Sequence, residues 1–366
     1  MKIAILTPGG VDRSGTDRVI PCLLWLIERL VEGGDEVHVF AFSQEAEPGH
    51  WPLLGAQVHN AGRRPRSARL ARMLVAEHRR APFDVLHAFW ALPSGFVGAI
   101  VGRLLRRPLL LTLPGGDVTF LPDIGYGSLG RRCDRLRVRL ATAAARRITA
   151  PSRFLQQQAK AAGVEAVVVP LGVALDRWPR RPPQPRDRDA PLRLLHVGSL
   201  NRVKDQGTLL EAAALLKERQ IPFVLDIVGE DTLGGAVQRR ADALDLAGQA
   251  RFHGGLPHAE VRPWMEQADL LVVSSRHEAG PLVTLEAAIA GVATVGTAVG
   301  HIADFAPAAA VAVPIGDAAA LAEAIGGLAA DEPERLRLAG AAQALALAAD
   351  ADFTAAEFRR LYAELR

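Results

Sequence analysis

Short apolar runs alternate along this chain with helix-length amphipathic segments, and this rhythm restricts the possible folds more than any other feature. Strand-like runs occupy residues 2–7, 36–42, 84–88, 109–113, 147–150 and 167–170, then 193–197, 223–228, 269–274, 293–295 and 311–314. Between them apolar residues recur at helical spacing, as over 19–31 before Gly33 and Gly34. Repeated βαβ units build parallel sheets covered by helices, so the sequence predicts an α/β fold.

Two domains are expected, because 366 residues exceed what one hydrophobic core usually supports. A stretch rich in proline and charge separates the two series of strand-like runs, and such composition is typical of a linker. The predicted parts are an N-terminal Rossmann-like domain over 1–175, a linker over 176–192 and a C-terminal Rossmann-like domain over 193–350. Residues 351–366 are expected to form a helix, which is free to cross back to the N-terminal domain.

Charge is divided unevenly along the chain. Residues 1–190 hold 28 Lys and Arg against 17 Asp and Glu, whereas the remainder holds 15 against 23. A basic half can face phosphate groups, nucleic acid or an anionic membrane, and an Arg-rich solvated surface explains it equally well. The densest basic run comprises Arg63, Arg64, Arg66, Arg69 and Arg72.

Cysteine and histidine usage indicates no metal site. Cys22 and Cys133 are the only cysteines and lie far apart, so neither a disulfide framework nor a zinc site is predicted. The N-terminus has no signal-peptide pattern, and a cytoplasmic location is expected. The isolated histidines at 87, 253, 258 and 301 are interpreted as structural or surface residues.

The stretch 269–291 carries the most functional information. An apolar strand runs into Gly280-Pro281, a turn that opens a helix and leaves the amides of Leu282 and Val283 among the free donors of its first turn. A helix N-terminus of this kind binds phosphate well. Gly280, Leu282 and Val283 are therefore candidate ligands of a phosphorylated molecule.

Two glutamates flank this turn. Glu278 precedes it and Glu286 follows eight positions later, so one carboxylate can reach past a diphosphate toward a sugar while the other binds ribose hydroxyls. The Glu278-x7-Glu286 spacing, with Gly-Pro between the acids, resembles the family-four retaining glycosyltransferases of GT-B fold. That resemblance implies two Rossmann-like domains whose parallel sheets face a central cleft, with the nucleotide-sugar donor held mainly by the C-terminal domain.

Another segment matches the same family in the expected order. The loop from Gly198 to Lys204 is similar to the family's glycine loop, where a basic residue meets the donor diphosphate, and Lys204 falls at the lysine position. The family's usual arginine after the glycine is Ser199 here. Either Arg202 substitutes for that arginine, or one phosphate contact is lost.

Two shorter matches concern the nucleoside. Residues 226–230 resemble the family's strand ending in Gly and an acid, which implicates Gly229, and 252–256 resemble its base-binding turn, which implicates the backbone of Leu256. Tight turns after buried strands would produce the same patterns, because glycine has access to positive φ.

Residues 9–18 lead into the first amphipathic helix as the family's glycine-rich loop does, so Gly15 and Thr16 are candidate donor-binding residues. The spacing of Gly10 and Gly15 is close to that of a nucleoside triphosphate-binding loop. Thr16 stands where such a loop needs lysine, which disfavours triphosphate hydrolysis.

Residues 111–117 resemble the family's strand ending in His-Gly-x-Asp, with Pro114 in place of the histidine. If the histidine normally contacts the transferring sugar, Asp117 or a backbone group has to compensate. Asp117 is accordingly a candidate catalytic residue, and a cap or turn role is equally consistent with its position.

The resemblance implies a retaining, metal-independent hexosyltransferase of polysaccharide biosynthesis, with Glu278, Lys204, Arg202 and Asp117 as candidate catalytic residues. The donor is a nucleotide-sugar, the acceptor a glycan, lipid-linked or small molecule, and neither a cofactor nor nucleic acid is expected. Peripheral contact with anionic membrane is left open by the basic half. Two alternatives remain: a non-catalytic two-domain nucleotide or sugar binder, and a nucleotide-sugar epimerase of the same fold.

Overall fold

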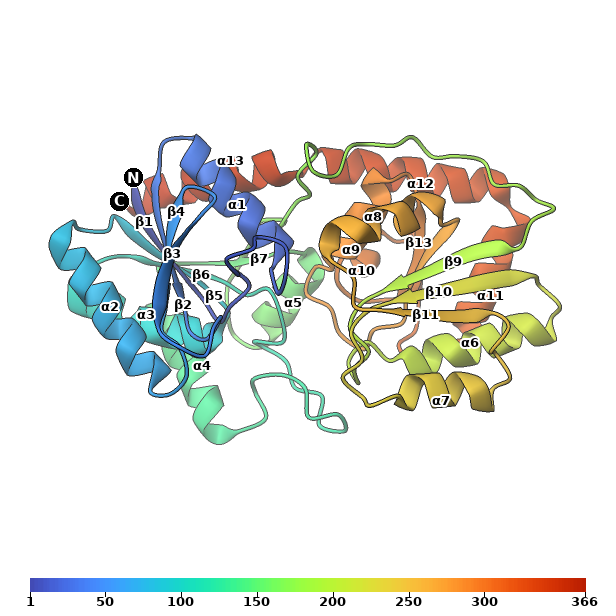
Figure 1. The fold of residues 1–366 in the computed structure, drawn as a ribbon, viewed down its shortest axis with the longest axis horizontal. Helices are drawn as coiled ribbons and strands as arrows, with labels where there is room; N and C mark the ends of the chain where they lie inside the picture. The colour runs from blue at the N-terminus through green and yellow to red at the C-terminus, as the bar shows by residue number, and fades with distance from the viewer. The chain divides into compact units, whose positions relative to one another are not determined.

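The structure, a computed structural model, describes residues 1–366 and divides into two compact α/β units (Figure 1). The first unit comprises Met1–Gly172 and Ala349–Arg366, and the second comprises Val173–Ala348. Each unit is built around one sheet with helices packed on it, so the predicted α/β class is confirmed. The cleft between the domains stays a prediction.

The first unit contains an eight-stranded sheet of order β3-β4-β2-β1-β5-β6-β7-β8. Its strands are β1 (Lys2–Thr7), β2 (Glu36–Ala41), β3 (Gly49–Leu53), β4 (Ala56–Asn60), β5 (Val85–Phe89), β6 (Leu109–Thr112), β7 (Arg147–Ala150) and β8 (Val167–Val168). All neighbours are parallel except β3, which pairs antiparallel with β4 at the edge. Every residue of β1 is buried, as expected for a central strand covered on both faces.

Helices cover this sheet and complete its core. They are α1 (Pro21–Glu32), α2 (Arg66–Arg80), α3 (Phe96–Leu105), α4 (Arg132–Ala144), α5 (Arg153–Ala161) and α13 (Ala351–Leu365), with a short π-helical turn η1 (Ala91–Gly95). The C-terminal helix α13 packs on α1, and Phe358 and Tyr362 are buried in the core of the first unit. The Tyr362 hydroxyl also lies 2.6 Å from Nδ1 of buried His87 on β5.

The second unit contains a six-stranded, wholly parallel sheet of order β11-β10-β9-β12-β13-β14. Its strands are β9 (Leu192–Val197), β10 (Phe223–Val228), β11 (Ala250–Gly254), β12 (Leu270–Val273), β13 (Ala293–Thr297) and β14 (Val311–Val313). Its helices are α6 (Gln206–Glu218), α7 (Ala236–Ala243), α8 (His258–Gln267), α9 (Leu282–Ile289), α10 (Gly300–Phe305), α11 (Ala318–Ala330) and α12 (Glu332–Leu347). The chain winds outward from β9 in both directions, which creates a topological switch point between β9 and β12.

Three strands do not appear among the sequence predictions. The hairpin of β3 and β4 turns at Leu54 and Gly55, whose φ values of 50° and 78° suit a two-residue hairpin turn. Polar residues and Pro52 obscure the alternation of this edge hairpin. Residues 252–254, expected as part of a turn, instead belong to β11, and the turn begins after them.

The proline-rich stretch 176–192 packs on the second unit and is not a free linker. The Trp178 side chain is 1% exposed, and its ring nitrogen donates to the Glu286 carbonyl at 3.1 Å. The Arg181 amide donates to the Ile289 carbonyl, and Arg335 donates to the Gln184 carbonyl. A buried tryptophan and satisfied backbone groups therefore hold the stretch in place, although its composition is that of a linker.

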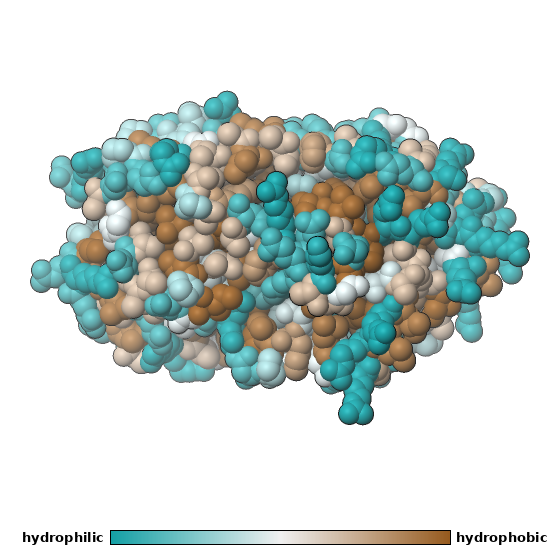
Figure 2. All heavy atoms as spheres, turned by 180° about the vertical axis from the view of Figure 1, so that it is seen from behind, coloured by the Kyte–Doolittle hydropathy of each residue, from teal (hydrophilic) through white to brown (hydrophobic).

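Hydrophilic and hydrophobic side chains are interspersed on the face drawn in Figure 2. Scattered apolar side chains are ordinary on protein surfaces. None of the helices combines the length and the apolar character needed to cross a bilayer.

Candidate functional site

The predicted donor residues of the second unit follow the carboxyl ends of its parallel strands. Gly198 follows β9, Gly229 follows β10, Leu256 follows β11 and Glu278 follows β12. These strand ends share one edge of the sheet, which is where ligands bind in open α/β folds. Residues predicted from separate stretches of sequence are therefore gathered at one place.

A short ion pair bridges the switch point between β9 and β12. The Lys204 ammonium, on the loop after β9, donates to Oε1 of Glu278 at 2.6 Å, and the Ser275 hydroxyl donates to the same oxygen at 2.6 Å. The Ser274 hydroxyl donates to the Lys204 carbonyl at 2.8 Å, which fixes the two loops together. An ammonium has three protons, so Lys204 keeps two donors for a further anion.

Helix α9 begins at Leu282 directly after the Gly280-Pro281 turn, as the sequence predicts. Its first-turn amides at Leu282 and Val283 have no acceptor inside the helix. Gly300, at φ +52°, backs this turn so closely that a β-carbon there would lie 2.6 Å from Cδ of Pro281. The turn is thus held rigidly with its amides at the carboxyl edge of the sheet.

Glu286 lies in the second turn of α9 and is almost fully enclosed. Its side chain is 4% exposed, and Oε1 lies 2.5 Å from Nε2 of His258 at the start of α8. The His258 ring stacks at a tilt on Trp178, with centroids 5.2 Å apart. Oε2 makes no hydrogen bond in the structure, and the predicted role of Glu286 in binding ribose stays a prediction.

His258 was interpreted as a structural or surface residue, whereas the structure places it against a predicted donor ligand. The two residues are 28 positions apart and on different helices, so no sequence spacing connects them. The only local signal of a role for His258 in the site is its position at the start of a helix that follows a strand.

Close packing surrounds two of the predicted glycines, by backbone at Gly229 and by a side chain at Gly198. A β-carbon at Gly229 would lie 2.0 Å from the Gly198 carbonyl oxygen, which no side chain could tolerate. Gly198, at φ +158°, has the methylenes of Lys204 beside it, the nearest at 3.3 Å. These contacts bring the loops after β9 and β10 together at backbone distance.

Three histidines lie buried beneath the loops. Burial lowers the pKa of His196 to about 4 and that of His301 to about 4, and burial also lowers the pKa of His277. Nδ1 of His196 donates to the Val272 carbonyl at 3.0 Å. The imidazoles are therefore neutral near pH 7 and supply no positive charge beside Lys204.

Arg202 is exposed and makes neither a hydrogen bond nor an ion pair. It lies two residues from Lys204 on the same loop, so its guanidinium is free to approach an anion there. A role of Arg202 in place of the arginine missing at Ser199 stays a prediction.

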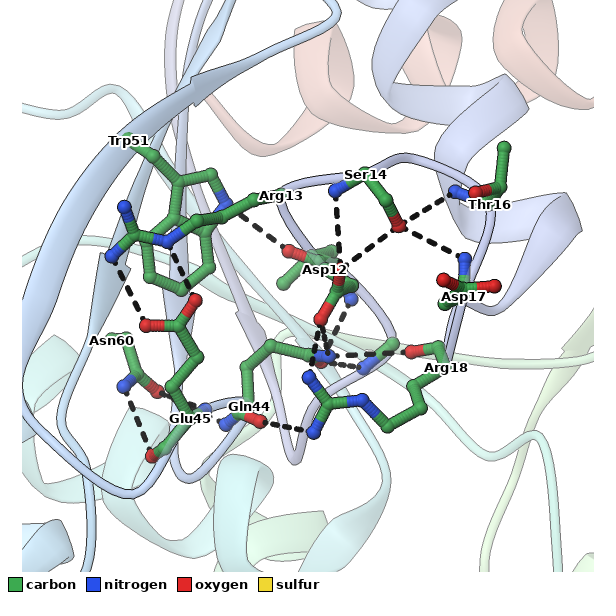
Figure 3. Close-up of polar contacts among 12 residues, drawn as sticks. Asp12, Arg13, Ser14, Thr16, Asp17, Arg18, Gln44, Glu45, Trp51 and Asn60 are labelled. Atoms are coloured by element: carbon green, nitrogen blue, oxygen red, sulfur yellow. Dashed lines mark hydrogen bonds and ion pairs between the residues drawn. The ribbon is translucent and has the colours of Figure 1, made fainter.

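The remaining predicted residues belong to the first unit. Gly15, at φ +68°, and exposed Thr16 lie on the loop after β1 (Figure 3). Asp117 is 1% exposed and its Oδ1 accepts from the Ala91 amide at 2.7 Å, a contact between segments 26 residues apart. Burial raises the pKa of Asp117 to about 7. A role of these three residues in donor or sugar binding stays a prediction.

The first unit also gathers one cluster with metal-ligand chemistry. Ligand atoms of Glu36, His38 and Glu77 lie within 4.8 Å of one another. The Lys2 ammonium already bonds both carboxylates, at 3.0 and 2.9 Å, and so supplies the positive charge there.

Known families match both units of this chain. The model "Glycosyl transferase 4-like domain" matches residues 19–172, and "Glycosyl transferases group 1" matches residues 179–345. D-inositol 3-phosphate glycosyltransferase 1 of Catenulispora acidiphila is 31% identical over 353 residues, covering 82% of this chain and 79% of that protein. The chain therefore belongs to the family-four type of glycosyltransferases, which confirms the family that the sequence motifs resemble.

A second relative is the putative teichuronic acid biosynthesis glycosyltransferase TuaC of Bacillus subtilis. It is 30% identical over 265 residues, which is 70% of this chain and 62% of TuaC. The match thus spans less than two thirds of that relative.

Solved structures share the fold. Sucrose-phosphate synthase from Thermosynechococcus elongatus matches with a TM-score of 0.82 at 19% identity, over 100% of this chain and 98% of that chain. HepE from Anabaena, solved in complex with UDP-glucose, matches with a TM-score of 0.76 at 21% identity, over 100% of both chains. The chain has the GT-B glycosyltransferase fold.

Proposed function

We propose that this protein transfers a sugar from a nucleoside diphosphate sugar to a hydroxyl of a glycan, lipid-linked or small-molecule acceptor. The observation that carries the proposal is the Lys204–Glu278 pair at the switch point, directly before the N-terminus of α9. A cation, two free amides and a carboxylate at one strand edge suit a donor with a diphosphate and a sugar. The UDP-glucose complex of HepE supports a nucleotide-sugar donor.

Departure of the nucleoside diphosphate builds negative charge on its leaving oxygen. Lys204, with two donors not used by Glu278, and the amides of Leu282 and Val283 are fixed before the reaction begins. Preorganised donors of this kind stabilise developing charge without reorganisation. Exposed Arg202 adds a second positive charge on the same loop as Lys204.

The proposed reaction retains configuration at the anomeric carbon and needs no metal ion. The acceptor hydroxyl attacks from the face that the diphosphate leaves, and the departing phosphate oxygen takes the hydroxyl proton. Glu278 lies against the sugar, where positive charge grows at the anomeric carbon. Lys204 and the α9 amides take the place that a divalent cation has in metal-dependent transferases.

The donor is tested by thermal shift with UDP-, GDP- and ADP-sugars. We expect the nucleotide-sugars of one base to raise the Tm of the protein by several degrees. Ligand at about 100 times its Kd stabilises the folded protein by about 2.7 kcal/mol. The matching nucleoside without phosphate serves as control. Slow release of nucleoside diphosphate without acceptor would support a transferase, and tight binding without release would favour the non-catalytic binder. A Tm unmoved by all three classes would contradict the proposal.

We further propose that α3 and α4 of the first unit dock on anionic membrane. Ile100 and Leu104 on α3 and Leu136 and Leu140 on α4 are between 50% and 69% exposed, and these two helices pack together. The same helices and the residue before α4 carry five exposed arginines, namely Arg103, Arg131, Arg132, Arg135 and Arg139. Apolar side chains framed by arginine suit the boundary between lipid headgroups and acyl chains. Membrane contact would bring a lipid-linked acceptor within reach.

Flotation with vesicles tests this docking. The wild-type chain should float with phosphatidylcholine vesicles that contain phosphatidylglycerol, and a Leu104→Gln, Leu136→Gln, Leu140→Gln variant should float about ten-fold less. Exposed Leu345 on α12 provides the control, Leu345→Gln, which should behave as wild type. Equal flotation of the triple variant, or wild-type binding indifferent to anionic lipid, would contradict the docking.

A further inference from the structure

A pocket of about 750 Å³ opens in the first unit, and its lining includes none of the candidate donor residues. It is lined by Arg18, Ser43, Gln44, Glu45, Ala46, Arg63, Arg64 and Arg66. Its walls are the loops after β1, β2 and β4, which are neighbours in the sheet and run parallel. The pocket therefore lies at the carboxyl edge of the sheet, the usual ligand edge of such folds.

Positive charge in this pocket is not balanced by the protein. Glu45 is the only carboxylate in the lining, and Arg13 already bonds both its oxygens, at 2.6 and 3.0 Å. The side chains of Arg63, Arg64 and Arg66 make no ion pair or hydrogen bond. Three guanidinium groups within four residues repel one another unless an anion joins them.

The start of α2 adds to this imbalance. Arg66 is the first residue of the 15-residue helix, Pro65 caps it without a side-chain hydrogen bond, and no acidic residue stands in the first turn. Helix N-termini favour negative charge and leave amides unsatisfied. Arginine at this position works against the helix dipole, and a bound anion would reverse that effect.

The pocket is built on a fixed frame. The Asn60 side-chain amide donates to the carbonyls of Glu45 and Glu47 at 3.1 and 2.6 Å, and its oxygen accepts from the Gln44 amide at 3.0 Å. The Arg63 amide donates to the Ala46 carbonyl at 2.8 Å. These bonds hold the loops after β2 and β4 together.

The loop after β1 is tied to the same frame (Figure 3). Oε1 of Gln44 accepts from the amides of Gly10 and Val11 at 2.6 and 3.0 Å. Oδ2 of Asp12 pairs with the Arg18 guanidinium at 2.5 Å. The guanidinium of Arg18 is thereby directed over Gln44 at the side of the pocket.

Arg69 belongs to the densest basic run, but its side chain bonds the protein's own backbone. Its guanidinium donates to the carbonyls of Ala61 and Arg63, at 2.6 and 3.2 Å, and so supports the loop that carries the other arginines. Of the five arginines in the run, Arg69 supports the loop, Arg63, Arg64 and Arg66 line the pocket, and exposed Arg72 lies outside its lining.

We propose that this pocket binds a phosphate group of the acceptor. The proposal rests on the proposed transferase function and names the class of its second substrate. Guanidinium forks and helix amides match the several oxygens of phosphate, which distributes charge over more contacts than a carboxylate can. Arg63, Arg64 and Arg66 supply the charge, and Arg18 closes the side of the pocket. The phosphate belongs to a soluble phosphorylated acceptor or to the head of a lipid-linked one.

Arginine modification by phenylglyoxal, followed by peptide mass spectrometry, locates the site without reference to the donor. Inorganic pyrophosphate at about ten times its Kd should slow modification of Arg63, Arg64 and Arg66 about ten-fold, because only the free pocket reacts. Exposed Arg72, Arg79 and Arg103 should react at unchanged rates and serve as internal controls. Equal rates at all six arginines would overturn the proposal.

Two further arms distinguish the sources of the phosphate. Protection by glycerol 3-phosphate in solution supports a soluble acceptor, whereas protection only by phosphatidylcholine vesicles containing phosphatidic acid supports a lipid-linked one. Vesicles that protect exposed Arg79 as strongly as Arg64 would indicate general surface adsorption and overturn the pocket.

Calorimetry on matched variants completes the test. Arg63→Gln, Arg64→Gln, Arg66→Gln should weaken pyrophosphate binding at least ten-fold, and Arg72→Gln, Arg79→Gln, Arg103→Gln removes the same charge without effect. The titration is made with the donor nucleoside diphosphate saturating, so that the site in the second unit is occupied. Equal weakening in both variants would overturn the pocket. Failure of the donor screen, with pyrophosphate still protecting Arg63, Arg64 and Arg66 from phenylglyoxal, would refute only the transferase function.

Discussion

Replacement of Lys204 by alanine is expected to lower kcat about 10²- to 10³-fold while the protein remains folded. The reason is that Lys204 holds Glu278 at 2.6 Å and has two further protons for the departing diphosphate. Removing one preorganised donor from a developing anion typically costs this much. Steady-state kinetics with the donor identified by thermal shift, with circular dichroism for folding, provide the measurement.

Glu278→Gln should also act chiefly on kcat, because its charge gains strength as positive charge grows on the sugar. Since the two side chains touch, the double variant Lys204→Ala, Glu278→Gln should lose less than the two separate losses combined. Lys217, which pairs with Asp245 at 2.6 Å on the same unit, supplies the control Lys217→Ala with unchanged kinetics. Wild-type kcat in both site variants would refute this assignment of the donor site.

Replacement of Glu286 by glutamine is expected to raise the donor KM about ten- to hundred-fold with little change in kcat. Ribose does not change during the reaction, so its contacts contribute equally to ground and transition states. A lost charge-assisted hydrogen bond is worth about 1.5 to 3 kcal/mol, which gives this range. Glutamine keeps the shape of the enclosed side chain, whose exposure is only 4%.

We expect His258 to act on the donor through Glu286, as a positioning residue. His258→Ala should raise KM in the same direction but less, and should add little in a Glu286→Gln background. Glu211→Gln, which breaks a surface pair with Arg240 in the same unit, is the control. If His258→Ala lowered the Tm and left KM unchanged, its contact with Glu286 would be structural only.

The order of strands and helices along the chain follows from the local pattern of apolar, glycine and proline residues. β1, β7 and β10 have the bounds that their apolar runs predict, because each run ends directly before a proline or a glycine. The start of α9 was also predictable, since Gly280-Pro281 is a local turn signal. The hairpin of β3 and β4 was missed because its polar residues do not alternate clearly, and pairing across the sheet stabilises it instead.

The same division applies to the candidate site. The spacing of Glu278 and Glu286 lies within one strand-turn-helix unit, so sequence alone placed both acids around the helix start. The Lys204–Glu278 pair spans 74 residues and the His258–Glu286 pair 28, and both depend on which strands are neighbours. Likewise Arg18 joins the basic run at 63–66 because β1, β2 and β4 are adjacent in the sheet. Periodicity and turn chemistry act over a few residues, whereas charge partners are selected by packing between loops that only the folded sheet brings together.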